Sequence, residues 1–173
     1  MLFARRKKME ITNCSTIYDV RKLTVDDIGM IYELCHKNEL FYKYHPPFVT
    51  TASIAEDMQA LPPNKQLEDK YYLGFFDQQL IAVMDLILDY PQAKTAYIGF
   101  FMVDKKAQGK NIGSKIIEDC LNFLKLMGFE KCQLAIDRGN PQSEAFWLKN
   151  KFVKTKEERP NAHSAYVSML RQL

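Results

Sequence analysis

The chain has few residues of the kinds that build zinc sites, disulfide frameworks or membrane spans. Its four cysteines stand far apart without a CxxC pair, and its three histidines show no metal-ligand spacing. The longest apolar runs, such as 86–88 and 100–103, fall far short of the roughly 20 residues of a membrane helix. These absences argue against a metal centre, a disulfide scaffold and a membrane protein. We expect a reducing, cytoplasmic setting.

The chain also lacks an excess of one charge and any low-complexity segment. Its 24 basic and 21 acidic residues leave a formal net charge of +3, and 47% of its 173 residues are hydrophobic. This balance is typical of a folded globular domain and not of a protein covered in basic residues to hold nucleic acid. The basic cluster at 5–8 has no apolar stretch after it. We expect residues 1–16 to form an N-terminal extension and residues 17–173 to form one domain.

The spacing of apolar residues predicts an ordered series of strands and helices. A strand over 18–23 and two helices, one starting near Thr24 and one over 54–61, precede strands over 71–76, 80–88 and 96–103. A long amphipathic helix from Ile112 to about Met127 leads to a strand over 131–136, a helix over 142–150 and strands over 152–156 and 164–170. The short links between the strands over 71–76, 80–88 and 96–103 predict an antiparallel meander. The strand–helix–strand passage over 97–136 instead requires parallel pairing of its two strands. The predicted fold class is α/β (α+β): a mixed, mostly antiparallel sheet of about six or seven strands, with helices on both faces.

The stretch 103–114, VDKKAQGKNIGS, lies between a buried strand and the start of the long helix. Unpaired N–H groups at a helix N-terminus suit an anionic phosphate, and Gly109 and Gly113 let the main chain approach it. Positive charge around the turn comes from Lys105, Lys106, Lys110 and Lys115. The spacing fits neither a Walker loop nor a dinucleotide fingerprint. We therefore expect a site for a diphosphate group of another kind of ligand.

The turn resembles the signature of the GCN5-related N-acetyltransferase (GNAT) family, Q/R-x-x-G-x-G/A, at the helix after the fourth strand. Here the six positions are Gln108, Gly109, Lys110, Asn111, Ile112 and Gly113. A second segment, Asn140 followed by Ala145-Phe146-Trp147 and Lys151-Phe152, is similar to the family's N…A…(Y)EKxGF segment. The order of elements over about 18–170 matches too. The resemblance implies the GNAT-like acyl-CoA acyltransferase fold and transfer of an acetyl group from acetyl-CoA to a primary amine of a small molecule or peptide.

The resemblance also implies where acetyl-CoA binds. It places pantetheine along Phe101, Met102 and Val103, the pyrophosphate on the amides from Gln108 through Ser114, and Asn140 and Trp147 on the cofactor side. The backbone N–H of Met102 is the expected oxyanion donor in a direct attack through a ternary complex, which requires no metal. Asn111 replaces the middle glycine of the signature. Because Asn tolerates left-handed backbone, we expect weaker binding of the phosphate and not its loss.

The sequence does not identify the group that protonates the leaving thiolate. Trp147 stands where many relatives have a tyrosine, and its indole N–H donates hydrogen bonds but is too weak an acid to give up the proton. Water, Ser143 and Tyr166 are alternatives. Trp147 is equally well explained as an aromatic residue packed on a helix face.

The sequence does not identify the general base either. Some relatives have a glutamate on the fourth strand where this chain has Tyr97, and a neutral tyrosine is a poor base near pH 7. Asp85 on the preceding strand and Glu33 on the first helix are alternatives, as is a chain of water molecules. Each of the two carboxylates could instead be a strand-face or solvated-helix group without a catalytic role.

The acceptor pocket is expected between the first two helices and their connection. Glu33, Tyr42, His45 and Phe48 are the candidate acceptor-binding residues, with Phe41 and Tyr44 nearby. Aromatic faces can enclose an apolar or cationic amine, although the same residues beside two prolines could simply cover the core.

Two other functions compete with acetyl transfer. The first is a non-catalytic acyl-CoA-binding regulatory module. It would also explain Asn111, Trp147 and the absence of an obvious general acid and base. Nucleic-acid binding through the basic stretch 149–159 is weaker, because Glu157 and Glu158 interrupt it and no stacking aromatic accompanies it. We expect no nucleic acid and no membrane partner. A homodimer is physically reasonable because an open sheet has exposed edges.

Overall fold

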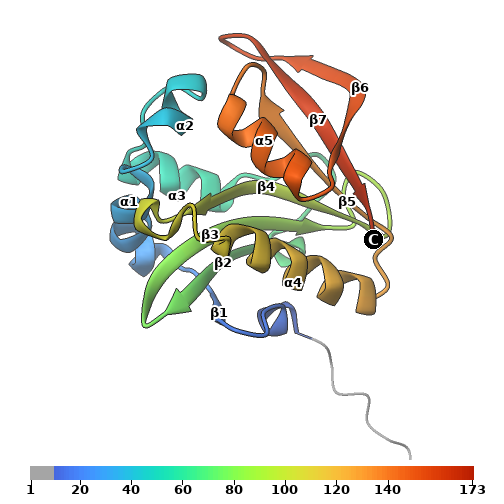
Figure 1. Cartoon of the computed structure of the whole chain (residues 1–173), viewed down its shortest axis with the longest axis horizontal. Helices are drawn as coiled ribbons and strands as arrows, with labels where there is room; N and C mark the ends of the chain where they lie inside the picture. Colours follow the sequence, from blue (N-terminus) through green and yellow to red (C-terminus); the bar gives the residue numbers. More distant parts are fainter. Residues whose placement is uncertain (1–9) are drawn as a thin grey trace, which may run out of the picture.

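The computed structural model describes residues 10–173, which form one mixed sheet with helices on both faces (Figure 1). Its strands are β1 (Asp19–Lys22), β2 (Lys70–Asp77), β3 (Gln79–Leu88), β4 (Thr95–Val103), β5 (Lys131–Asp137), β6 (Val153–Pro160) and β7 (Ala165–Gln172). They lie in the order β1-β2-β3-β4-β5-β7-β6. Within the described residues β4 and β5 pair in parallel and the other neighbours are antiparallel. The predicted fold class is confirmed.

The helices are α1 (Ile28–Cys35), α2 (Glu39–Tyr44), α3 (Thr51–Gln59), α4 (Ile112–Leu126) and α5 (Pro141–Lys149). The sequence prediction missed α2, because Pro46 and Pro47 suggested that the whole stretch before them was broken. Those prolines end the helix only after Tyr44, since a proline disturbs mainly the turn that precedes it. No helix in residues 10–173 is long and apolar enough to cross a membrane.

Two hydrophobic clusters pack on opposite faces of the sheet. On one face, α4 buries an apolar stripe that includes Ile116, Ile117 and Leu121. On the other face, α1 and α3 pack against the sheet through residues such as Ile31 and Ile54. Each fully buried Ile or Leu side chain contributes about 1.5–3 kcal/mol to the free energy of unfolding, so this packing holds the helices firmly in place.

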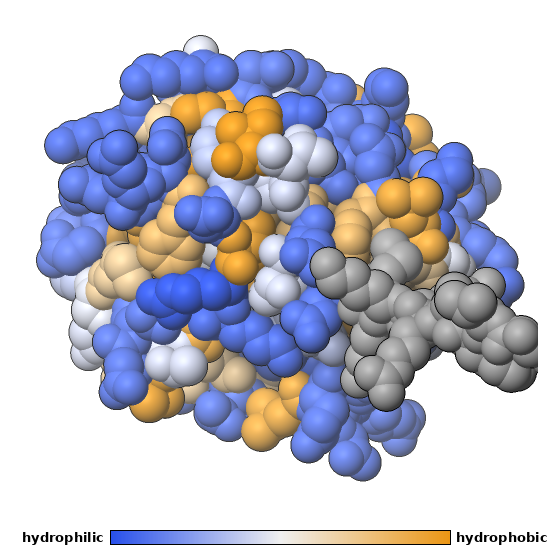
Figure 2. Space-filling model, turned by 90° about the horizontal axis from the view of Figure 1, so that it is seen from below, coloured by the Kyte–Doolittle hydropathy of each residue, from blue (hydrophilic) through white to orange (hydrophobic). Residues whose placement is uncertain are grey.

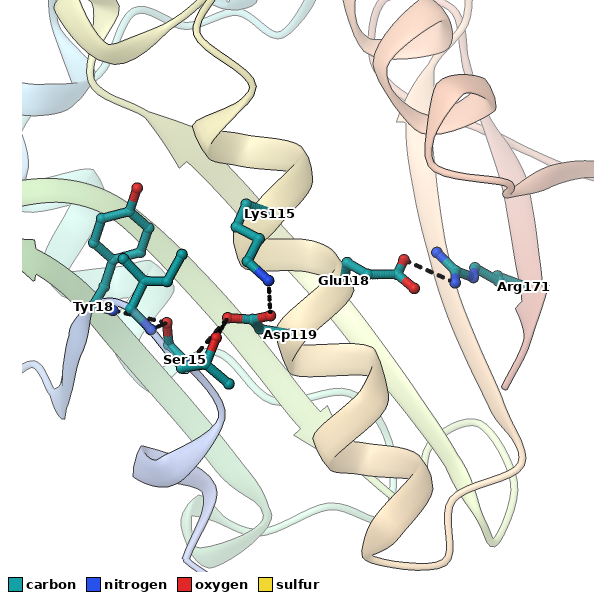
Figure 3. A network of polar contacts seen from close by, with 8 residues as sticks. Ser15, Tyr18, Lys115, Glu118, Asp119 and Arg171 are labelled. Atoms are coloured by element: carbon teal, nitrogen blue, oxygen red, sulfur yellow. Dashed lines mark hydrogen bonds and ion pairs between the residues drawn. The ribbon is translucent and has the colours of Figure 1, made fainter.

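The N-terminal segment that the structure describes packs against α4 (Figure 3). Ile11 and Cys14 are buried in the larger cluster, and Asp119 of α4 accepts hydrogen bonds from the backbone N–H and hydroxyl of Thr16 at 2.9 and 2.7 Å. The sequence prediction assigned residues 1–16 to an extension. Residues 10–16 instead form part of the packed domain, and residues 1–9 lie outside the described residues.

Two ion pairs involve side chains of α4. Lys115 donates to Asp119 at 2.8 Å, and Arg171 of β7 pairs with Glu118 at 3.0 Å (Figure 3). Lys115 was expected at the phosphate-binding turn, but this ion pair directs it toward the N-terminal segment. Seen from below, hydrophilic residues cover most of the surface, and hydrophobic residues form separate patches (Figure 2).

Strands β4 and β5 separate part of the way along their length. They pair from Thr95 and Lys131 to Ile98 and Leu134, and the ladder ends there. A bulge at the same level of the β3–β4 ladder makes Gly99 an extra residue, because Ile98 faces Leu86 but Phe100 faces Asp85. The opening between the two strands holds the candidate site.

Candidate active site

Two cavities of about 470 Å³ each meet at the opening between β4 and β5. The first, which we call the α4 pocket, lies under the turn before α4 and is lined by 101–103, 107–114 and residues of α5. The second, which we call the splay pocket, lies between the separated strands, α3 and β7. Four residues line both cavities: Phe41, Phe101, Ser143 and Trp147. Two ligands, one bound in each pocket, would therefore lie next to each other beside Phe101.

Residues with left-handed backbone and several side-chain hydrogen bonds fix the conformation of the turn before α4. Gly109 has φ +73° and Asn111 has φ 63°, so the expectation that Asn111 accepts a left-handed conformation is confirmed. Gln108 Nε2 donates to Asn38 Oδ1 at 2.6 Å and to the carbonyl of Val103 at 2.9 Å. Lys149 donates to Asn111 Oδ1 at 3.1 Å and adds a positive charge that the sequence prediction did not place here.

Gly113 lies where α4 packs closely against its neighbours. A Cβ at this position would lie 3.1 Å from Phe146 Cε2 of α5 and 3.1 Å from Val103 Cγ2 of β4. Such contacts are tighter than most Cβ atoms make, so a side chain here would require Phe146 or Val103 to shift by a few tenths of an ångström. The next residue, Ser114, accepts a hydrogen bond from Asn150 Nδ2 at 3.1 Å, which joins α5 to the same turn.

The register of β4 corrects the predicted oxyanion donor. The backbone N–H of Asp104 donates to Ile81 of β3 at 2.8 Å. Successive residues of a strand point their N–H groups to opposite sides, so Met102, which faces Val83, also directs its N–H toward β3. Phe101 and Val103 direct theirs toward the opening. The geometry therefore favours the N–H of Phe101, and not that of Met102, as a donor to a ligand.

Trp147 is a packed aromatic residue at the junction of the pockets. It is buried, and its ring lies 6.0 Å from that of Phe101, 4.9 Å from Phe146 and 5.1 Å from Phe152. Asn140 is buried below the start of α5, where its Oδ1 accepts from the backbone N–H groups of Gln142 and Ser143 at 3.1 and 3.2 Å. Asn140 thus caps a helix and does not line the α4 pocket.

A histidine–carboxylate pair forms part of the splay pocket wall. His45 follows α2, Asp137 ends β5, and His45 Nδ1 lies 3.0 Å from Asp137 Oδ2. The hydrogen bond to Asp137 raises the pKa of His45 from its ordinary value of 6.5, although burial acts against this. With Nδ1–H donating to the carboxylate, Nε2 of neutral His45 is left to accept a proton.

A second charged pair lies on the β2–β3 side of the splay pocket. Lys70 Nζ donates to Asp85 Oδ2 at 2.7 Å, and both residues are buried. Burial raises the pKa of Asp85, and Lys70 opposes this shift. Asp57 of α3 faces the same pocket, and partial burial raises its pKa while His45 and Lys70 act to lower it.

The remaining predicted residues do not gather at one point. Tyr97 lines the splay pocket with its ring 5.2 Å from Tyr90, and burial raises its pKa further above 10.0, so it is no proton acceptor near pH 7. Of the four candidate acceptor-binding residues, His45 alone lines the splay pocket. Glu33 is exposed elsewhere, and the ring of Tyr42 packs at a tilt against that of Phe48 with centroids 5.1 Å apart. Within residues 10–173 no three acidic, His or Cys side chains gather as a metal site would require.

Sequence reasoning missed Asp137, Lys70 and Asp57. Asp137 stands 92 positions after its partner His45, and no local spacing links the two. A buried lysine in a strand has no periodic signal of its own, and Asp57 reads as an ordinary polar position on a helix.

The chain is similar to known proteins in both sequence pattern and fold. A family model described as "Acetyltransferase (GNAT) family" matches residues 33–152. An acetyltransferase from Thermus thermophilus superposes with a TM-score of 0.73 and 20% identity, covering 90% of this chain and 97% of that one. The PaiA N-acetyltransferase of Thermoplasma acidophilum, solved with coenzyme A, gives 0.64 and 20%, covering 90% and 99%. No curated protein sequence matches the chain.

Proposed function

The chain belongs to the GNAT acetyltransferase family, and we propose that it transfers an acetyl group from acetyl-CoA to a primary amine by direct attack in a ternary complex. The observation that carries this proposal is the meeting of the two pockets at Phe101, Phe41, Ser143 and Trp147. A thioester in the α4 pocket and an amine in the splay pocket would adjoin there. Holding two reactants in such geometry supplies a large part of the rate by itself.

The α4 pocket fits acetyl-CoA. The free N–H groups at the start of α4, together with Lys110 and Lys149, would hold the pyrophosphate. The unpaired edge of β4 at Phe101 and Val103 would hold the pantetheine amides. Bound acetyl-CoA supplies a thioester carbonyl, and the Phe101 N–H would stabilise negative charge on its oxygen.

The splay pocket offers a proton acceptor. His45 Nε2 is free to take the proton of an attacking amine, and Asp137 holds the ring and stabilises its charged form. Asp85 is a poorer base because Lys70 already occupies one of its oxygens. Ser143, which lines both pockets, and Tyr166, whose ring centroid lies 6.2 Å from that of His45, are the nearby hydroxyls for the leaving thiolate.

Calorimetric titration with acetyl-CoA, CoA and a dephosphorylated analogue tests the cofactor site. Lys110→Glu places negative charge in the α4 pocket, and we expect it to weaken binding at least about tenfold. Lys125→Glu is the matched control, since Lys125 is also exposed but lies in the last turn of α4, outside the pocket. No binding of any of the three ligands would overturn the proposal.

Acetyl transfer itself is measured as thiol release and as the mass of the product with a panel of amines and peptides. Product with any amine supports the proposal. Binding of acetyl-CoA with no product from any acceptor would instead favour the non-catalytic acyl-CoA-binding module. The cytoplasmic setting and the homodimer stay predictions, to be tested by fractionation and by light scattering.

A further inference from the structure

The splay pocket contains an arginine that has no acidic partner. Resting on the acetyl transfer proposed above, we propose that the acceptor is an amino acid, meaning a small amine that also carries a carboxylate, and that Arg159 binds this carboxylate. The inference goes beyond a general amine acceptor, because it names a second group that the pocket recognises and the residue that recognises it.

Most charged side chains of the splay pocket pair with one another. The histidine–carboxylate pair and the buried lysine–aspartate pair described above account for four of them. Asp57 and Arg159 also line the pocket, and neither forms an ion pair within residues 10–173. These two unpaired charges have opposite signs. They match a ligand that carries an amine and a carboxylate.

Arg159 has no partner because its acidic neighbours in β6 are placed elsewhere. Glu158 pairs with Arg138. Glu157 lines a smaller cavity beside the splay pocket, but among the described residues it forms no ion pair with Arg159. Arg159 is exposed and lines the splay pocket, so a ligand can reach it without any change of the fold.

The two unpaired charges act on different parts of the pocket. Besides the hydrogen bond described above, the charge of Asp57 acts to raise the pKa of His45. Burial raises the pKa of Tyr97 and of Tyr166, and the charge of Arg159 acts to lower both. The end near α3 is therefore acidic, and the end near β6 is basic. An amino acid bound along the pocket would place its amine near His45 and its carboxylate at Arg159.

The strand register puts Arg159 on the same face of the sheet as the proposed base. Arg159 of β6 faces Tyr166 of β7, and Tyr166 faces Asp137 of β5. Residues directly opposite each other in antiparallel strands place their side chains on one face. Asp137 holds His45, whose ring centroid lies 6.2 Å from that of Tyr166. Tyr166 thus lies between the base and the proposed carboxylate site.

The surroundings of Arg159 suit a carboxylate. The smaller cavity, of about 190 Å³, adjoins the splay pocket at Tyr90, Tyr97, Arg159 and Tyr166, which line both. A guanidinium can bind both oxygens of a carboxylate at once, and tyrosine hydroxyls can donate further hydrogen bonds to them. The adjoining cavity gives the bound group room beside the arginine.

The test compares amino acids with their carboxamides, which have the same shape but no negative charge. Glycine, aminopropanoate and aminobutanoate, each with its amine at the end of the chain, provide acceptors of increasing length. The measured quantity is kcat/KM for acetyl product, followed by thiol release and mass spectrometry. We expect at least one carboxylate to exceed its carboxamide by about fivefold or more, a modest factor because water screens an exposed ion pair.

Variants assign the preference to its residue. Arg159→Gln should bring the ratio of carboxylate to carboxamide close to one, and its activity with the carboxamide shows that it is folded. Arg159→Lys keeps the charge but loses the planar fork, so its ratio should lie between those of the wild type and Arg159→Gln. Lys156→Gln is the matched control, since it removes an exposed positive charge from β6 outside the cavities, and the ratio should stay as in the wild type.

The outcomes separate this inference from the proposed function. No product from any amine overturns the proposed function and the acceptor class with it. Product from other amines, with no preference for any of the carboxylates over its carboxamide, overturns the acceptor class alone. A preference that survives in Arg159→Gln, or that Lys156→Gln abolishes equally, overturns the assignment to Arg159.

Discussion

His45 is the group whose replacement tests the chemistry most directly. In His45→Gln the proton acceptor is lost but the pocket keeps a polar side chain of similar size. A positioned general base contributes about 10²–10⁴-fold, so we expect kcat/KM to fall by that factor, which corresponds to about 2.7–5.4 kcal/mol of transition-state free energy. His163→Gln is the matched control, because His163 is exposed in the turn between β6 and β7 and lines neither pocket.

The pH dependence gives the sharper readout. Asp137 raises the pKa of His45 from 6.5, and only neutral His45 accepts a proton, so wild-type activity should rise with pH through that raised pKa. The ratio of wild-type to His45→Gln activity cancels the titration of the acceptor amine and should increase over the same range. In Asp137→Asn the rise should shift to lower pH, with a lower plateau. A ratio that is flat with pH, or a His45→Gln variant as active as His163→Gln, would refute the reasoning.

Three further predictions concern stability and reactivity. Gly113→Ala, whose methyl group would crowd α5 and β4, should be less stable in chemical denaturation than Gly29→Ala, whose methyl group would meet nothing beyond its own helix within 4 Å and should add about 0.5–1 kcal/mol. Burial acts to raise the pKa of Asp119, but hydrogen bonds lower it below 3.8, so Asp119→Asn should cost about 1–3 kcal/mol near neutral pH and less as pH falls through the native pKa. Burial raises the pKa of Cys35 and Cys132 to about 12, so mass spectrometry should find both unmodified by iodoacetamide in the native protein and modified after unfolding.

The order of elements was predictable because each has a local signal. The apolar stripe of α4 and the branched and aromatic residues of β2, β3 and β4 specify their type at short range. The α2 helix was missed because its six residues carry no full apolar period and two prolines follow closely. Residues 10–16 were assigned to an extension because the burial of Ile11 depends on α4, about a hundred positions later.

The site was predictable only where one segment builds it. Residues 108–114 lie together in the sequence and in the α4 pocket, so one motif sufficed to find them. The pair of His45 and Asp137 and the pair of Lys70 and Asp85 each join two separate elements. Their partners are set by strand order and register, which depend on the whole sheet. The same register directs the Met102 N–H toward β3, which no motif reveals.

The bulge at Gly99 determines which groups of β4 face the opening. Before it, Ile98 faces Leu86, and after it, Phe100 faces Asp85, so the strand is shifted by one residue relative to β3. A shift of one residue exchanges the two sides of a strand. Without it, Phe101 would direct its N–H toward β3, and its ring would leave the stack with Phe146. The extra residue thus turns the Phe101 amide toward the opening. In the proposed complex, the position of the thioester therefore depends on this irregularity of β4.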